Sequence, residues 1–173
     1  MNLIEKIRNV PDFPKPGIGF KDITTLLLDG ASFKQSIDEL AELFDAGNID
    51  KILGVEARGF IFASALAYKW RKGVILARKP GKLPADKLSQ EYELEYGTDK
   101  IEIHHDAIQP GERILIIDDL LATGGTVAAA TKLVETAKGE IAGIGFLIEL
   151  TFLNGRSKIE NYNVRSLITF DNE

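Results

Sequence analysis

The chain has 173 residues, of which 45% are hydrophobic and 27% charged, as expected for one globular domain with a sizeable buried core. Its 26 acidic and 21 basic residues give a net charge of −5, which disfavours long-range attraction to nucleic acid. Without cysteine, disulfides and thiolate chemistry are excluded. The sequence contains neither a signal-peptide core nor an apolar run of membrane-spanning length, so we expect a cytoplasmic protein with no membrane partner.

The first thirty residues do not follow a regular α/β pattern. A short helix is predicted over residues 2–9, because Asn2 can cap it and Glu5 lies three positions further on. Three prolines then predict a rigid loop over residues 11–20. We expect residues 1–30 to form a small hood over the carboxyl edge of a sheet.

Strands and helices alternate through the rest of the chain. Ser32 and Gln35 form a capping-box pattern before a helical apolar stripe that ends at Phe44. Strands are predicted over residues 51–57, 74–77, 114–117, 141–150 and 164–170, and helices over 60–70 and 127–137. This order predicts a single α/β domain over residues 1–173, with a twisted, mostly parallel central sheet and helices on both faces. Residues 80–98 are polar and loop-like, which predicts a flexible lid, and residues 101–105 alternate like an exposed strand.

One segment carries most of the chemical information. The apolar strand 114–117 runs into two carboxylates, Asp118 and Asp119, and a Thr/Gly turn then opens an alanine-rich helix. Acids at the carboxyl end of a parallel strand lie where open α/β sheets bind ligands. The turn presents backbone N–H groups and hydroxyls to an anion. The combination suits a phosphorylated ribose, and the segment matches neither a Walker A loop nor a dinucleotide fingerprint.

Two further segments carry cations at strand ends. Arg58 precedes Gly59 at a predicted helix start, where a guanidinium and free N–H groups could clamp a diphosphate. Arg78, Lys79 and Lys82 follow a buried strand within five residues. Taken alone, the Arg58 segment could equally be a surface turn, and the segment from Arg78 to Lys82 would more often be a solvated turn.

The segment from Asp118 to Thr126 closely resembles the phosphoribosyl-pyrophosphate signature of the type I phosphoribosyltransferases. Four more blocks, at residues 14–23, 56–60, 78–84 and 94–97, resemble adenine phosphoribosyltransferases. The resemblance implies the fold of that family and the conversion of adenine and phosphoribosyl pyrophosphate to AMP and pyrophosphate. It also implies Mg²⁺ held mainly by the substrate near the two acids, a homodimer, and a cis peptide between Glu56 and Ala57.

The resemblance also assigns roles by position. Asp118 and Asp119 would contact the ribose hydroxyls, and Arg58 and Lys79 would neutralise the diphosphate, with Arg78 and Lys82 near the partner subunit's site. Glu95 would be the acid at purine N7, with Tyr96 beside it. Phe20 and Leu150 would flank the base while the backbone around Lys21 reads its edge. The 5′-phosphate would be held by Ala122, Thr123, Gly124, Gly125 and Thr126.

Two alternatives stay open at this point. A xanthine-type phosphoribosyltransferase shares the acidic signature, and a sensing regulator could keep the sheet without catalysis. Ala122 favours adenine, because 6-oxopurine enzymes carry an aspartate there and the lid residue Glu95 can supply an acid instead. Some family members have arginine in place of Lys21 and a bulkier residue in place of Gly19, so side-chain contacts at those positions are left open.

Overall fold

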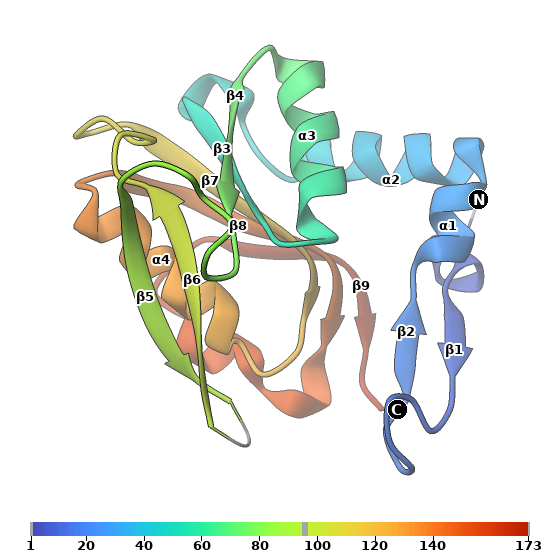
Figure 1. Cartoon of the computed structure of the whole chain (residues 1–173). Coiled ribbons are helices and arrows are strands. Elements are labelled where there is room, and N and C mark those ends of the chain that lie inside the picture. The colour runs from blue at the N-terminus through green and yellow to red at the C-terminus, as the bar shows by residue number, and fades with distance from the viewer. Residues whose placement is uncertain (1, 95–96, 173) are drawn as a thin grey trace.

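A computed structural model describes residues 2–94 and 97–172 (Figure 1). Its central sheet has five parallel strands in the order β4-β3-β7-β8-β9. The strands are β3 (Lys51–Val55), β4 (Gly73–Ala77), β7 (Arg113–Leu121), β8 (Glu140–Leu150) and β9 (Val164–Phe170). The chain first moves from β3 to β4, and then returns past β3 to β7. The strand order therefore reverses between β3 and β7, which is where open sheets of this kind bind ligands.

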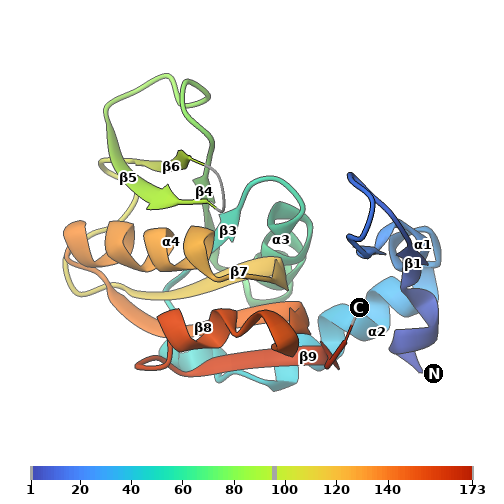
Figure 2. The ribbon, with the colours of Figure 1, turned by 90° about the horizontal axis from the view of Figure 1, so that it is seen from below.

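Both faces of this sheet are covered. Helices α2 (Gly30–Glu42) and α3 (Gly59–Trp70) pack on one face, and α4 (Gly125–Thr136) packs on the other beside the hairpin of β5 (Lys87–Glu93) and β6 (Thr98–His104). Figure 2 shows α4 and the hairpin on the side opposite α2. Burial on both faces explains the continuous apolar run in β7, where Ile114, Leu115, Ile116 and Ile117 are all inaccessible to solvent. The predicted fold class is confirmed.

The amino-terminal prediction is only partly correct. Asn2 does accept a hydrogen bond from the Ile4 N–H group, at 3.2 Å, but it caps a short 3-10 helix, η1 (Leu3–Lys6). The predicted helix over residues 2–9 is wrong beyond that point, because β1 (Arg8–Val10) pairs antiparallel with β2 (Phe20–Asp22). The Arg8 guanidinium also donates to the Asp22 carboxylate, at 2.9 Å from Nε. This long-range pairing outweighs the local helical signal.

Two other local predictions need correction. Helix α2 is capped by Asp29, which accepts hydrogen bonds from the Ala31 N–H group at 3.2 Å and the Ser32 hydroxyl at 2.6 Å, so Ser32 is not the cap. The loop predicted over residues 80–98 is wrong over residues 87–93, which form strand β5. The strand predicted over residues 101–105 is present as part of β6, but it is not exposed, because Ile101 and Ile103 are buried in the core that α4 helps to form.

The remaining elements are short connections. Helix α1 (Thr24–Leu28) follows β2, and the 3-10 helix η2 (Ala46–Asn48) precedes β3. Two more 3-10 helices, η3 (Thr151–Leu153) and η4 (Gly155–Lys158), connect β8 to β9. Within the described residues, no helix has both the length and the apolar character needed to span a bilayer.

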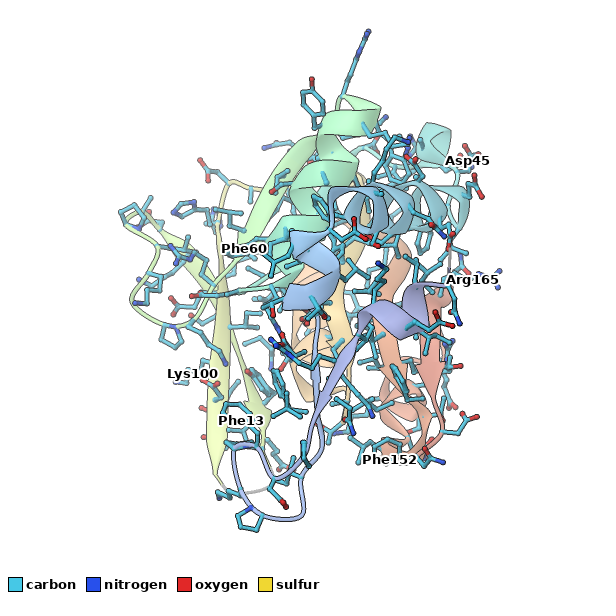
Figure 3. All side chains as sticks on the ribbon, turned by 90° about the vertical axis from the view of Figure 1, so that its right-hand side faces the viewer. Phe13, Asp45, Phe60, Lys100, Phe152 and Arg165 are labelled. Carbon is cyan, nitrogen blue, oxygen red and sulfur yellow. The ribbon has the colours of Figure 1, made fainter. Side chains whose placement is uncertain are left out.

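The carboxyl ends of the central strands face the lower end of the molecule in Figure 1. The loop between β1 and β2 and the carboxyl end of β5 lie at the same end. Figure 3 shows Phe13, on that loop, and Phe152, which follows β8, both at this end. Three parts of the chain that are distant in sequence thus surround the carboxyl edge of the sheet.

Candidate active site

The turn between β3 and α3 lies directly against β7 at the reversal of strand order. The Glu56–Ala57 peptide in this turn is cis, as the resemblance implied. Gly59 begins α3, and a methyl group added to it would lie 2.8 Å from Asp118 Oδ1 and 2.9 Å from the Ile117 carbonyl oxygen. Both distances are too short for a real contact. Glycine at this position therefore lets the start of α3 approach the acidic end of β7.

The two signature acids, which we call the acid couplet (Asp118 and Asp119), lie within β7 rather than just after it. Asp118 Oδ1 accepts a hydrogen bond from the Asp119 N–H group at 2.8 Å. The Asp119 side chain is 7% exposed, and its Oδ2 lies 2.9 Å from Arg58 Nε. The two charged groups are in contact, but their geometry is not that of a hydrogen bond. Asp119 Oδ2 is therefore a buried acceptor that receives no hydrogen bond from any described residue.

The environment of the acid couplet opposes its full ionisation. Burial raises the pKa of Asp118, and the neighbouring Asp119 charge raises it further. Burial also raises the pKa of Asp119, although Arg58 acts in the opposite direction. A ligand that brings hydroxyl donors or a cation to these oxygens would relieve this cost.

The phosphate turn (residues 122–126) joins β7 to α4. Gly124 has a φ of 79° and occupies the cap position of α4, so the turn depends on a left-handed residue there. A small hollow of about 90 Å³ is lined by Asp118, Leu120, Leu121, the five turn residues and Val127. The first N–H groups of a helix have no partner within the helix, and the dipole of a twelve-residue helix attracts an anion to them. The hollow can therefore bind a phosphate next to the acid couplet.

Phe20, predicted to flank the base, extends the site toward the amino-terminal segment. Its ring contacts the Phe13 ring edge-on, with 5.2 Å between centroids, and the Arg58 guanidinium carbon lies 5.1 Å from the Phe20 centroid. Arg58 thus touches both Phe20 and Asp119. Lys21 is buried, and its Nζ donates to Asn9 Oδ1 at 3.1 Å and lies over the Phe170 ring.

The cations after β4 bind carboxylates that the sequence analysis did not assign to the site. Arg78 Nε lies 3.3 Å from Glu56 Oε2, which also accepts the Lys79 N–H group at 2.7 Å. Burial opposes ionisation of Glu56, but these hydrogen bonds and the nearby Lys82 charge leave its pKa below the ordinary value. Nothing in the sequence pattern indicates these pairs, because the partners are about twenty residues apart.

Lys79 is also connected to the hairpin. Its ammonium donates to the Tyr92 hydroxyl at 2.8 Å and pairs with the Asp99 carboxylate. Glu95 and Tyr96, the predicted acid and its neighbour, lie outside the described residues. Leu150 is buried at the carboxyl end of β8.

Comparison with known proteins identifies the family. The family model described as phosphoribosyl transferase domain matches residues 24–172. An adenine phosphoribosyltransferase of Clostridium perfringens is 58% identical over 171 residues, which cover 99% of each chain. The chain belongs to the adenine phosphoribosyltransferase family. Another such enzyme, from Chloroflexus aurantiacus, is 56% identical with 98% of each chain covered.

Solved structures of adenine phosphoribosyltransferases agree with this assignment. The crystal structure of the Thermoanaerobacter pseudethanolicus enzyme has a TM-score of 0.94 and 54% identity, covering 98% of this chain and 100% of the other. The Saccharomyces cerevisiae enzyme, crystallised with an imino-altritol bisphosphate and adenine, has a TM-score of 0.90 and 40% identity, covering 95% and 96%. The family resemblance of the sequence motifs is therefore confirmed.

Proposed function

We propose that this protein transfers the 5-phosphoribosyl group of phosphoribosyl pyrophosphate to adenine, giving AMP and pyrophosphate in purine salvage. The observation that carries the proposal is the contact between Arg58 and Asp119, at 2.9 Å, across the reversal of strand order. It joins a diphosphate-binding cation to an acceptor for ribose hydroxyls, beside a turn suited to phosphate. The names of the relatives support adenine as the base.

The sugar phosphate would lie along the end of β7. The acid couplet would accept hydrogen bonds from the ribose hydroxyls, which supplies the missing partner of Asp119 Oδ2. The 5′-phosphate would occupy the hollow of the phosphate turn, bound by the N–H groups at the start of α4 and the hydroxyls of Thr123 and Thr126. The anomeric carbon would then lie between the acid couplet and Arg58.

The reaction exchanges one bond at that carbon for another. The lone pair of adenine N9 forms the new C–N bond as the proton of N9 is lost, the C–O bond to diphosphate breaks, and its electron pair leaves with the diphosphate oxygen, which can take up that proton. Arg58 and Lys79 would stabilise the charge that develops on this oxygen, with Arg78 and Lys82 nearby. Lys79 would have to leave Asp99 to do so.

Magnesium would bind at this site together with the substrate. Among the described residues, no group of three or more His, Cys, Asp or Glu side chains could hold a metal ion. The acid couplet offers two carboxylates, and Mg²⁺ typically binds one or two carboxylates together with substrate phosphates and water. When bound, the ion would neutralise the diphosphate. The two acids would hold it near the ribose.

Adenine would bind between the hood and the end of β8. Phe20 would stack on one side of the base and Leu150 on the other, while the backbone around Lys21 reads the amino edge. Glu95 would donate to purine N7, with Tyr96 beside it on the lid. The lid predicted over residues 80–98 and the hood would together cover the base and exclude water from the reacting carbon.

A homodimer is part of the proposal. Exposed apolar side chains occur on α3 and on the neighbouring edge strand β4, including Tyr68, which is 89% exposed, and Ile61, Val74 and Leu76. Ile61 and Tyr68 are seven positions apart, so they lie on one face of α3. An apolar surface of this kind marks a protein contact. Sedimentation at several concentrations would test for the dimer.

A nucleobase panel tests the proposed activity. Radiolabelled adenine, hypoxanthine, guanine and xanthine are each incubated with phosphoribosyl pyrophosphate, with and without Mg²⁺. We expect AMP from adenine only when Mg²⁺ is present. Turnover of xanthine alone would refute the proposal, and binding of phosphoribosyl pyrophosphate without transfer to any base would indicate a regulator.

A further inference from the structure

The connection between β8 and β9 lies directly behind the phosphate turn, although it is about thirty residues away in sequence. Gly155 at the start of η4 is buried. A methyl group added to Gly155 would lie 2.2 Å from the Ala122 carbonyl oxygen and 2.9 Å from the Gly124 nitrogen. Conversely, a methyl group added to Gly124 would lie 2.4 Å from the Gly155 carbonyl oxygen. The two backbones therefore touch with no room for a side chain on either.

The residue after Gly155 ties this connection to the sheet. Arg156 Nε donates to Glu149 Oε1 at 2.8 Å, Nη2 pairs with Oε2, and Nη1 donates to the Val164 carbonyl oxygen at 3.0 Å. The Ser166 hydroxyl donates to Glu149 Oε2 at 2.6 Å. Arg156 thus joins the end of β8 to the start of β9.

The anchor of this network is well buried. The Glu149 side chain is 6% exposed, and the hydrogen bonds from Arg156 hold its pKa below the ordinary value, so the carboxylate stays ionised. Two guanidinium N–H groups of an arginine can bind both oxygens of a carboxylate in one fixed orientation, which we call a fork. The single ammonium group of a lysine cannot reproduce this geometry. Arg156, and with it the adjacent Gly155, is therefore held in one place relative to the sheet.

We propose that Gly155 and the Glu149–Arg156–Ser166 network, together called the brace, are positioning residues for the 5′-phosphate. The brace rests on the proposed function. It touches no substrate atom. It fixes the backbone of Ala122 and Gly124 from behind, and so sets where the N–H groups of the phosphate turn point.

The contact distance gives the size of the effect. Ordinary van der Waals contact begins at 3.4 Å, so a methyl group on Gly155 would push the Ala122 carbonyl away by about 1 Å. A misplacement of about 1 Å in a binding group can cost about a hundredfold in kcat/KM. Because the diphosphate and the base are bound by other elements, this loss is expected only for ligands that carry the 5′-phosphate.

Two ligands separate this role from a general structural one. Ribose 5-phosphate carries the 5′-phosphate without the diphosphate, and pyrophosphate is the diphosphate alone. For Gly155→Ala, calorimetry should show ribose 5-phosphate binding weakened about tenfold or more, with pyrophosphate affinity within about twofold of the unchanged protein. KM for phosphoribosyl pyrophosphate should rise while KM for adenine stays constant. Gly30→Ala is the matched control, because a methyl group there meets nothing within 4 Å.

A second variant tests the proposal in case Gly155→Ala does not fold. Arg156→Lys keeps the charge but loses the fork, and it places no added atom between Gly155 and the phosphate turn. It should weaken ribose 5-phosphate binding in the same direction, by less. Equal losses for both ligands, or an unchanged affinity for ribose 5-phosphate in Gly155→Ala, would overturn the proposal. Because these are binding measurements, they remain decisive even if the nucleobase panel shows no adenine turnover.

Discussion

Replacing Asp118 with Asn should make the protein more stable and less active. Burial and the neighbouring Asp119 charge raise the pKa of Asp118, so the folded state retains a proton that the unfolded chain loses near the ordinary value of 3.8. The stability of the natural chain must then fall as pH rises from 3.8 through the folded pKa. Asparagine has no such proton, and its amide oxygen can still accept the Asp119 N–H group.

The size of the effect follows from proton linkage. One group changes the free energy of unfolding by at most about 1.4 kcal/mol per pH unit within its window. For a chain of this size, about 1 kcal/mol shifts Tm by roughly 2–4 °C. The difference in Tm between Asp118→Asn and the natural chain should therefore grow by at most about 3–6 °C for each pH unit above the ordinary Asp pKa. The variant should also use phosphoribosyl pyrophosphate less well than the natural chain does.

The assay is thermal unfolding across a pH series, with Asp50→Asn as a matched contrast. Hydrogen bonds from Arg113 lower the pKa of Asp50, so its carboxylate contributes stability above the ordinary value and loses it as pH falls. That variant should be less stable than the natural chain at neutral pH. A lower Tm for Asp118→Asn at neutral pH, or pH curves that run parallel, would refute the reasoning.

Three further predictions concern other charged groups. Asp119→Asn should strongly weaken use of phosphoribosyl pyrophosphate, because a ribose acceptor and a charge near the metal are lost, and unchanged kinetics would remove Asp119 from the site. Glu95→Gln should lower kcat more than substrate affinity, as expected for a group acting in the transition state, and an equal loss in binding would indicate a structural role. Glu149→Gln should lose about 1.5–3 kcal/mol at neutral pH, the usual worth of a hydrogen bond to a charged group. Chemical denaturation should show that this loss in the free energy of unfolding becomes smaller as pH falls below 4.5, the ordinary pKa of Glu. The reason is that the pKa of Glu149 is lowered in the folded state, so its carboxylate stabilises the protein less as pH falls. A loss that does not change with pH would contradict this.

The central sheet was predictable because burial on both faces leaves a clear trace in sequence. The run Ile114–Ile117 is apolar at every position, and glycines such as Gly59 and Gly125 begin the helices that follow two of the strands. The acid couplet was found for the same reason, since two carboxylates next to such a run are costly unless they are used.

The parts that were missed depend on partners far away in the chain. Strand β5 is polar and reads as a loop, but Tyr92 packs into the core and binds Lys79, which holds the hairpin in place. Strand β1 forms because residues 20–22 pair with it. Gly155 lies in a polar stretch with no periodicity, and its importance is visible only once the phosphate turn is folded against it.

The contact of Arg58 with Asp119 affects how the protein discriminates among ligands. In the free protein these two opposite charges partly compensate each other, so in the proposed binding mode a ligand that occupies the space between them would have to separate them. A molecule with sugar hydroxyls alone leaves the guanidinium without its counter-charge, and one with diphosphate alone leaves the carboxylate buried without its cation. Only a molecule that carries both groups at the right separation replaces each lost partner. In that binding mode, free pyrophosphate and simple ribose phosphates would compete poorly with the activated sugar.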